Sequence, residues 1–181
     1  MFSSQYGFNI TLTWEQRKLG EVSEMIGGNA WKSSDYSKDG SALVVTIANV
    51  QGDYYIDDSV GNYVSIENAG AYVLQQNDIL ISLTGNVGRV SRMTSRKAVL
   101  NQRVGKITVQ NRTDDEFFFQ AIKRPEFLTK MNESGQGAAQ MNISNSDVMN
   151  YEFQIPLFKE QCQIGVFFRS LDHLITLHQR K

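Results

Sequence analysis

Amide, hydroxyl and guanidinium side chains gather around glycines in three segments of the chain. These segments are residues 84–89 (TGNVGR), residues 101–106 (NQRVGK) and a third loop that contains Gln136, Gln140 and Asn142. Asn and Gln can bond adenine through two hydrogen bonds, Arg can bond guanine in the same way, and glycines let a backbone approach a DNA groove. The segments therefore suit base recognition, but ordinary polar turns whose amides satisfy buried backbone groups have the same composition.

Charge is unevenly distributed along the chain, although the formal net charge is only −1. Residues 39–88 hold six acidic residues and no Lys or Arg, giving −6, whereas residues 79–113 hold seven basic residues and no acidic one, giving +7. The basic residues are Arg89, Arg92, Arg96, Lys97, Arg103, Lys106 and Arg112. Such a strip can follow a phosphate backbone. It can equally be one of two solvated faces of opposite sign.

Residue types that could perform catalysis or bind a metal are badly placed. His173 and His178 both fall in the last apolar-periodic segment with no Ser or Cys partner beside them. The adjacent acidic pairs at residues 57–58 and 114–115 point apart and suit helix capping better than acid–base chemistry. Cys162 is the only cysteine, so a zinc site built from cysteines is excluded. The sequence predicts no catalytic residue, no metal site and no cofactor bound by this chain.

Apolar runs and cysteine content bear on where the protein works. The sequence has no run of 18 apolar residues, and residues 1–20 contain no charged segment followed by an apolar one. We therefore expect neither a membrane span nor a signal peptide. One cysteine fits a reducing compartment, and the expected location is the cytoplasm.

The middle of the chain is dense in β-branched and aromatic residues, which favour strands. Strands are predicted at residues 43–47, 54–56, 63–66, 78–83, 87–91, 98–100, 104–109 and 151–155. Helices are predicted after a cap at Thr113 or Asp114 and over residues 125–132, where Pro125 ends the first helix and permits the second. The predicted fold class is α/β of the mixed α+β kind, in which a β-rich domain precedes a terminal amphipathic helix.

That terminal helix is expected over residues 159–181. Apolar residues recur there at alternating spacings of three and four, which is typical of a coiled-coil seam. The proposed seam consists of Ile164, Phe167, Leu171, Leu174 and Ile175. The seam could pair with a partner helix, or the helix could dock on its own domain.

Five groups of motifs, taken in order, resemble the specificity (S) subunit of type I restriction–modification systems. They are residues 14–22 (WEQRKLGEV), 78–89 (DILISLTGNVGR), 98–107 (AVLNQRVGKI), 137–144 (GAAQMNIS), and 155–161 with 171–181 (IPLFKEQ and LDHLITLHQRK). The resemblance implies a target recognition domain over residues 14–156, an atypical lead-in at residues 1–13, and the start of a conserved dimerisation or spacer helix at residues 157–181. Only one recognition domain is present, so the chain resembles half of an S subunit.

The resemblance also implies a function and partners. An S subunit reads double-stranded DNA and catalyses nothing, while modification subunits with S-adenosylmethionine methylate adenine and restriction subunits use ATP and Mg to translocate and cleave DNA. Candidate DNA contacts are Lys32, Asn49, Thr84, Asn86, Arg89, Arg92, Asn101, Gln102, Arg103, Gln136, Gln140 and Asn142. The chain could be a half-subunit that forms a homodimer through its last helix, or a truncated cassette. A protein-interaction scaffold without DNA affinity of its own is the alternative function.

Overall fold

The computed structural model describes residues 14–179 except residues 39, 68, 111 and 137–140, and in the last helix it omits the side chains of residues 173 and 175–179. Within this part, the strands form two four-stranded sheets and one two-stranded ribbon. The first sheet has the order β2 (Ser23–Gly27), β9 (Val104–Val109), β6 (Ile79–Ser82) and β7 (Val90–Arg92), and all its neighbours are antiparallel. The second has the order β4 (Tyr63–Val64), β3 (Ala42–Val45), β8 (Ala98–Leu100) and β5 (Val73–Leu74), and its central pair β3–β8 is parallel.

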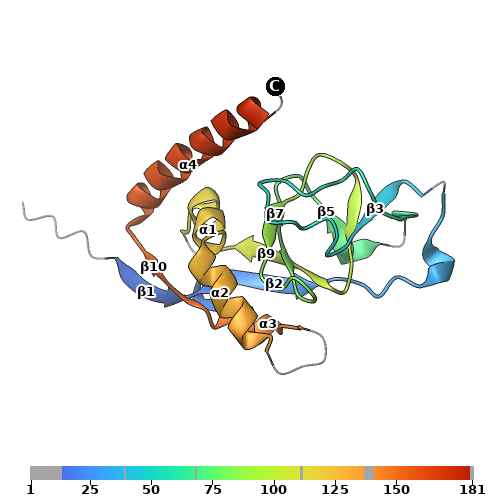
Figure 1. The fold of residues 1–181 in the computed structure, drawn as a ribbon, viewed down its shortest axis with the longest axis horizontal. Coiled ribbons are helices and arrows are strands. Elements are labelled where there is room, and N and C mark those ends of the chain that lie inside the picture. The colour runs from blue at the N-terminus through green and yellow to red at the C-terminus, as the bar shows by residue number, and fades with distance from the viewer. Residues whose placement is uncertain (1–13, 39, 68, 111, 137–140, 180–181) are drawn as a thin grey trace, which may run out of the picture.

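Helices follow the strands in the second half of the chain. They are α1 (Asp115–Ile122), α2 (Pro125–Ser134), α3 (Asn145–Met149) and α4 (Phe158–Gln179), and the ribbon pairs β1 (Glu15–Lys18) with β10 (Glu152–Ile155). Short 3-10 helices are η1 (Leu19–Glu21), η2 (Ser33–Asp35) and η3 (Gly70–Tyr72). In Figure 1 the two sheets lie at one end of the molecule and the helices at the other, where α4 extends away from the body.

Alternate residues of β6 face two different cores. Ile79 and Ile81 pack in the cluster that contains the buried phenylalanines of α1, whereas Leu80 lies in a second cluster with Leu43 and Leu100 of the other sheet. Both faces of β6 are therefore covered, which explains its continuous apolar sequence. The first sheet lies between the helices and the second sheet.

Local signals explain where the helices begin. The Asp114 carboxylate accepts a hydrogen bond from the Phe117 backbone N–H (2.9 Å), so Asp114 is the N-cap of α1. Pro125 occupies the first turn of α2, where its missing N–H costs nothing. Both helix starts confirm the sequence prediction, and α4 begins at Phe158, next to the predicted boundary between recognition domain and helix. The predicted lead-in at residues 1–13 lies outside the described residues.

The mixed α+β fold class is confirmed, but some strand predictions differ from the structure. Residues 54–56, an expected strand, form a loop. An isolated β-bridge joins Tyr55 to Arg92 of β7, with hydrogen bonds from the Ile56 N–H to the Arg92 carbonyl and from the Arg92 N–H to the Tyr54 carbonyl.

Strands β1 and β2 are not in the prediction. The four residues of β1 are polar and exposed, and in β2 the two apolar residues Met25 and Ile26 are adjacent instead of alternating with polar ones. Both strands form because β10 and β9, far away in sequence, offer partners.

Gly88 shows how the β6–β7 hairpin is fitted against α2. Its φ is +79°, and a Cβ there would lie 2.6 Å from Met131 Cβ, which belongs to a fully buried side chain. We expect Gly88→Ala to lower the free energy of unfolding by about 2–3 kcal/mol, because backbone strain and overpacking add. Urea denaturation measures this. Gly70→Ala is the matched control, since φ is +50° there and a Cβ would meet open space. Equal losses in both variants would show that Met131 yields to the added methyl group.

Candidate nucleic-acid interface

Backbone hydrogen bonds bring the three glycine-containing segments together at one end of the first sheet. The Leu83 N–H donates to the Arg103 carbonyl (2.9 Å), and the Leu83 carbonyl accepts from the Ile143 N–H (2.9 Å). The Gly85 N–H donates to the Met141 carbonyl (2.9 Å). The loop at residues 84–89 therefore lies between the turn at residues 101–103 and the segment at residues 141–143.

This surface, which we call the loop cluster, consists of residues 84–89, 101–103 and 141–143. Asn86, Gln102, Arg103 and Asn142 are exposed in it, and Thr84, Arg89 and Asn101 are partly exposed. Gln136 is also exposed, near the end of α2, and Gln140 lies outside the described residues. The predicted amide and guanidinium groups are therefore largely available to a ligand.

Internal contacts orient several of these side chains. The Arg89 guanidinium donates to Gln51 Oε1 (2.7 Å), and Asn101 Oδ1 accepts from the Arg103 N–H (3.1 Å). Thr84 Oγ1 is buried and has no hydrogen-bond partner within the described part of the chain. Buried hydroxyls are normally paired, so this loop has an unused polar group.

A fourth segment runs beside the loop cluster. The Asn29 N–H donates to the Leu100 carbonyl (3.1 Å), and the Asn29 carbonyl accepts from the Gln102 N–H (2.9 Å). The Trp31 indole N–H also donates to the Leu100 carbonyl (3.0 Å), which holds the exposed Lys32 near the turn. Asn29 and Gln51 are thus additional polar neighbours that sequence reasoning missed. Asn29 stands in a Gly-Gly-Asn turn that could have signalled it, whereas Gln51 has no such signal.

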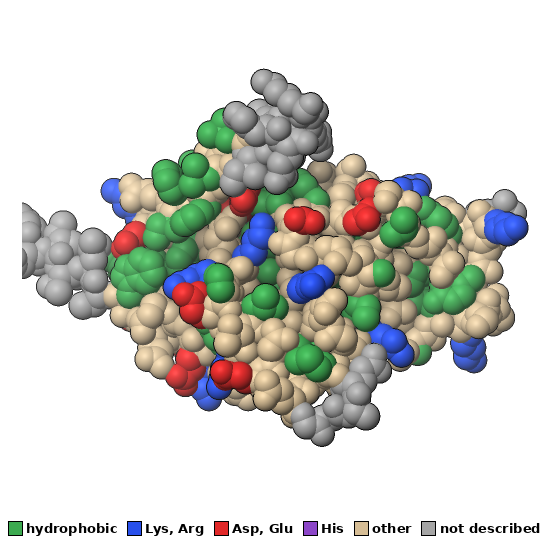
Figure 2. All heavy atoms as spheres, in the orientation of Figure 1, with side chains coloured by type: hydrophobic (Ala, Val, Ile, Leu, Met, Phe, Trp, Pro, Cys, Tyr) green, Lys and Arg blue, Asp and Glu red, His purple; other side chains and the backbone are tan. Residues whose placement is uncertain are grey.

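The seven basic residues do not form one continuous strip. Lys106 pairs with Asp78 (3.3 Å), and Arg96 donates to the Asp58 carbonyl (2.7 Å) and the Tyr63 hydroxyl (2.7 Å). Arg96 and Lys97 precede β8, whereas Arg103 follows it, so β8 separates them. Figure 2 shows Lys and Arg spread over the visible face with acidic side chains among them. Residues of the acidic segment 39–88 therefore bind Arg96 and Lys106 of the basic segment. Arg89 and Arg103 are the basic residues of the loop cluster.

Two predicted DNA contacts are wrong because their side chains are buried. Arg92 is only 2% exposed and pairs with Asp115 (2.7 Å) and Glu116 (3.2 Å). Asn49 is 1% exposed, and its amide donates to the Asp57 carbonyl (2.8 Å) and the Val60 carbonyl (2.9 Å). Both residues hold the domain together and are inaccessible to DNA.

The predicted seam of α4 is mostly uncovered. Phe167, Leu171 and Leu174 are 60%, 38% and 53% exposed. Ile164 instead packs against the domain's own core, which corrects its assignment as a pairing residue. The side chain of Ile175 lies outside the described part. Beside Ile164, a groove of about 660 Å³ opens among Trp14, Phe117, Ala121, Tyr151, Phe153 and Phe168.

Comparison with known proteins places this geometry in a family. A family model described as "Type I restriction modification DNA specificity domain" matches residues 11–181. The chain belongs to this family. The resemblance noted in the sequence is thereby confirmed.

Members of the specificity family are similar to this chain in sequence and in fold. The type I restriction enzyme EcoBI specificity subunit of Escherichia coli is 25% identical over 167 residues, which cover 91% of this chain and 33% of the relative. A chain from a structure of a type I R-M system covers 98% of this chain and 43% of its own length, with 21% identity and a TM-score of 0.72. The match to the HsdS subunit from Thermoanaerobacter tengcongensis covers 96% of this chain and 41% of that subunit, with 20% identity and a TM-score of 0.68. The chain thus spans less than half the length of these relatives.

The described residues also bear on metal binding and on membrane association. Among the described residues, no group of three or more His, Cys, Asp and Glu side chains is arranged to hold a metal ion. None of the described helices is long and apolar enough to cross a membrane.

Proposed function

We propose that this specificity-domain chain reads a short DNA sequence as one target recognition module of a type I restriction–modification complex. The observation that carries the proposal is the loop cluster, where segments far apart in sequence present Asn, Gln and Arg side chains side by side. A base edge is read by such amides and guanidiniums, and phosphates are held by Arg and Lys. We assign base contacts to Asn86, Gln102 and Asn142, and phosphate or guanine contacts to Arg89 and Arg103.

The partners follow from the same proposal. Modification subunits would bring S-adenosylmethionine and methylate adenine, and restriction subunits would bring ATP and Mg, so this chain would bind no cofactor and catalyse no reaction. All of this would take place in the cytoplasm, where the DNA is. Two copies would pair through the exposed seam of α4 (Phe167, Leu171 and Leu174) to rebuild a reader with two recognition domains. A scaffold that recruits the modification subunit without touching DNA is the competing function.

Genome-wide methylation mapping tests the proposed function directly. The chain is co-expressed with a cognate modification subunit in a host free of adenine methylation, and N6-methyladenine is located across the genome. A split palindromic motif is expected, because two identical modules read identical half-sites. An absence of methylation from a folded chain that still binds the modification subunit would favour the scaffold.

Arg103→Ala tests the loop cluster at a single side chain. We expect binding to a duplex with the mapped motif to weaken by about 10-fold to 100-fold, because one lost base or phosphate contact costs about 1–3 kcal/mol. A phosphate contact would also lower the salt slope by about 0.9. Fluorescence anisotropy over a salt series measures both quantities. Arg124→Ala is the control, since Arg124 is equally charged and exposed but lies before α2 and pairs with Glu126. Equal affinities for both variants would remove Arg103 from the interface.

A further inference from the structure

One face of α4 is polar and lies against α1. Gln161, Gly165, Arg169 and Asp172 follow each other at spacings of four, four and three, so they share a face of the helix. Each of them lies against the start or the outer side of α1. We call these four residues the docking face.

The first half of the docking face fits closely over the start of α1. Gln161 is 3% exposed, and its Oε1 accepts from the Asp114 N–H (2.9 Å) while its amide donates to the Pro156 carbonyl (2.8 Å). A Cβ at Gly165 would lie 2.6 Å from Asp114 Oδ1 and 3.1 Å from Glu116 Cβ. Because the Asp114 carboxylate already caps α1, it cannot move aside freely. Only glycine lets α4 approach this closely.

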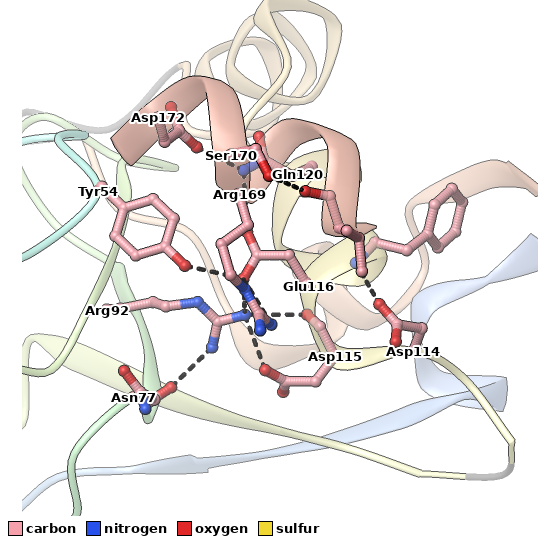
Figure 3. A network of polar contacts seen from close by, with 12 residues as sticks. Tyr54, Asn77, Arg92, Asp114, Asp115, Glu116, Gln120, Arg169, Ser170 and Asp172 are labelled. Carbon is pink, nitrogen blue, oxygen red and sulfur yellow. Dashed lines mark hydrogen bonds and ion pairs between the residues drawn. The ribbon is translucent and has the colours of Figure 1, made fainter. Parts of the chain in front are cut away.

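The second half of the docking face joins a polar network around the buried carboxylate of Glu116 (Figure 3). Glu116 accepts hydrogen bonds from the Tyr54 hydroxyl (2.8 Å) and from the Arg92 guanidinium (3.2 Å), and Arg169 approaches it at 3.4 Å. Gln120 donates both to Glu116 (3.0 Å) and to Asp172 of α4 (2.7 Å). The network thus contacts β7, α1 and α4 at once.

Two pKa shifts are consistent with this network. Burial, followed by the hydrogen bond to Glu116, raises the pKa of the Tyr54 hydroxyl to about 12. Burial is the largest single influence on Arg169 and disfavours its charge, but the attractions and hydrogen bonds to Glu116 and Tyr54 together exceed it and raise the pKa of Arg169 above its usual value. The proton on Tyr54 and the charge on Arg169 are therefore retained throughout the physiological range.

The docking face and the seam are different parts of the same helix. Phe167, Leu171 and Leu174 are exposed, whereas the docking face holds α4 on its own domain. Pairing through the seam would therefore leave the contacts with α1 in place. The connection from the loop cluster to α4 is also short. Strand β7 follows the loop at residues 84–89 and ends at Arg92. Arg92 and Arg169 of α4 both pair with Glu116.

We propose that Gly165 and Arg169 are positioning residues that fix the angle between α4 and the recognition domain, and that this angle sets the spacing between the two half-sites. The inference rests on the proposed function, because it needs two copies paired through α4. Once the helices are paired, the distance between the two loop clusters depends on how each domain is held on its own helix. Because protein interiors are closely packed, a change in the angle between α4 and the domain moves the whole loop cluster. One base pair is about 3.4 Å along the duplex, so a small change of angle is readable as a change of spacing.

A wedge variant tests this proposal. Gly165→Leu inserts a side chain between α4 and Asp114 while raising the helix propensity of α4 itself, and Arg169→Met removes the charge that α4 contributes at Glu116. Lys159→Leu is the matched control, because Lys159 is exposed on the same helix and the residues three and four positions from it belong neither to the docking face nor to the seam. The substrates are duplexes with the mapped half-sites separated by the natural spacer or by spacers one or two base pairs longer or shorter.

We expect complexes of the modification subunit with the wild type or with Lys159→Leu to methylate only the natural spacing. Complexes with Gly165→Leu or Arg169→Met should methylate a duplex with a spacer one or two base pairs longer or shorter at least about tenfold better than the wild-type complex does. The half-site sequence should stay the same. An unchanged spacing in both variants overturns the inference and leaves the proposed function standing.

Small-angle X-ray scattering gives a second readout that needs no methylation. The maximum dimension of Gly165→Leu should differ from that of the wild type and of Lys159→Leu at equal oligomeric state. Superimposable scattering curves would overturn the proposed role of the docking face, whatever the methylation result. Absence of methylation with the wild type would separately refute the proposed function.

Discussion

Arg92→Met is expected to lower the free energy of unfolding by about 3–5 kcal/mol, because it leaves the Glu116 carboxylate buried without its buried cationic partner. The guanidinium also lies 4.5 Å from the centre of the Phe119 ring and donates to the Asn77 carbonyl (2.8 Å). A Met side chain fills much of the volume but replaces none of these polar contacts. Guanidinium chloride denaturation followed by circular dichroism measures the loss.

Two further variants show whether the missing charge causes this loss. Arg124→Met removes an equally charged but exposed side chain, and we expect a change within about 0.5 kcal/mol. Adding Glu116→Gln to Arg92→Met should recover part of the stability, because no unpaired buried charge then remains. If Arg92→Met kept its stability and lost DNA affinity instead, Arg92 would be a DNA contact after all, contrary to its burial.

Charges on the seam of α4 are expected to have the second large effect. The double variant Phe167→Glu with Leu171→Glu should raise the dissociation constant of the homodimer by more than about 100-fold, because it places like charges where two apolar surfaces would meet. Methylation of the split motif should disappear with the dimer. Sedimentation equilibrium measures the first effect, and methylation mapping measures the second.

Val60→Glu is the matched control for the seam variant. Val60 is 53% exposed like the seam residues, but it lies in the loop before β4. A dimer that is weakened equally by both substitutions would indicate a general effect of added negative charge. A wild-type chain that sediments as a monomer at all concentrations, yet methylates a split motif, would refute pairing through α4.

The sequence is sufficient to predict the elements that have local causes. Strand β8 lies where its apolar run predicts it, since all three of its residues are buried. Strand β9 lies where its β-branched residues predict it. The start of α1 follows from its Asp114 cap. The polar strand β1 could not be predicted, because its only reason to be extended is β10, more than a hundred residues later.

The same distinction between local and distant causes applies to the candidate site. The polar loops could be found from their composition, and the structure brings them together as neighbours. The burial of Arg92 could not be found, because it depends on Glu116, 24 residues away and on another element. Arg92 and Arg89 look alike as residues in a basic segment, and only the fold assigns one to the core and the other to the surface.

The β1–β10 ribbon has a consequence for the order in which the chain is made. Glu15 pairs with Ile155, so the last pairing of the domain must wait until nearly all of it has left the ribosome, and contacts of such long range form slowly. Helix α4 follows β10 directly and is synthesised after it. Phe167 and Leu171 therefore leave the ribosome only after β10, when the β1–β10 ribbon can already form. The exposed apolar surface of α4 is thus absent while the domain is still incomplete and most prone to aggregate.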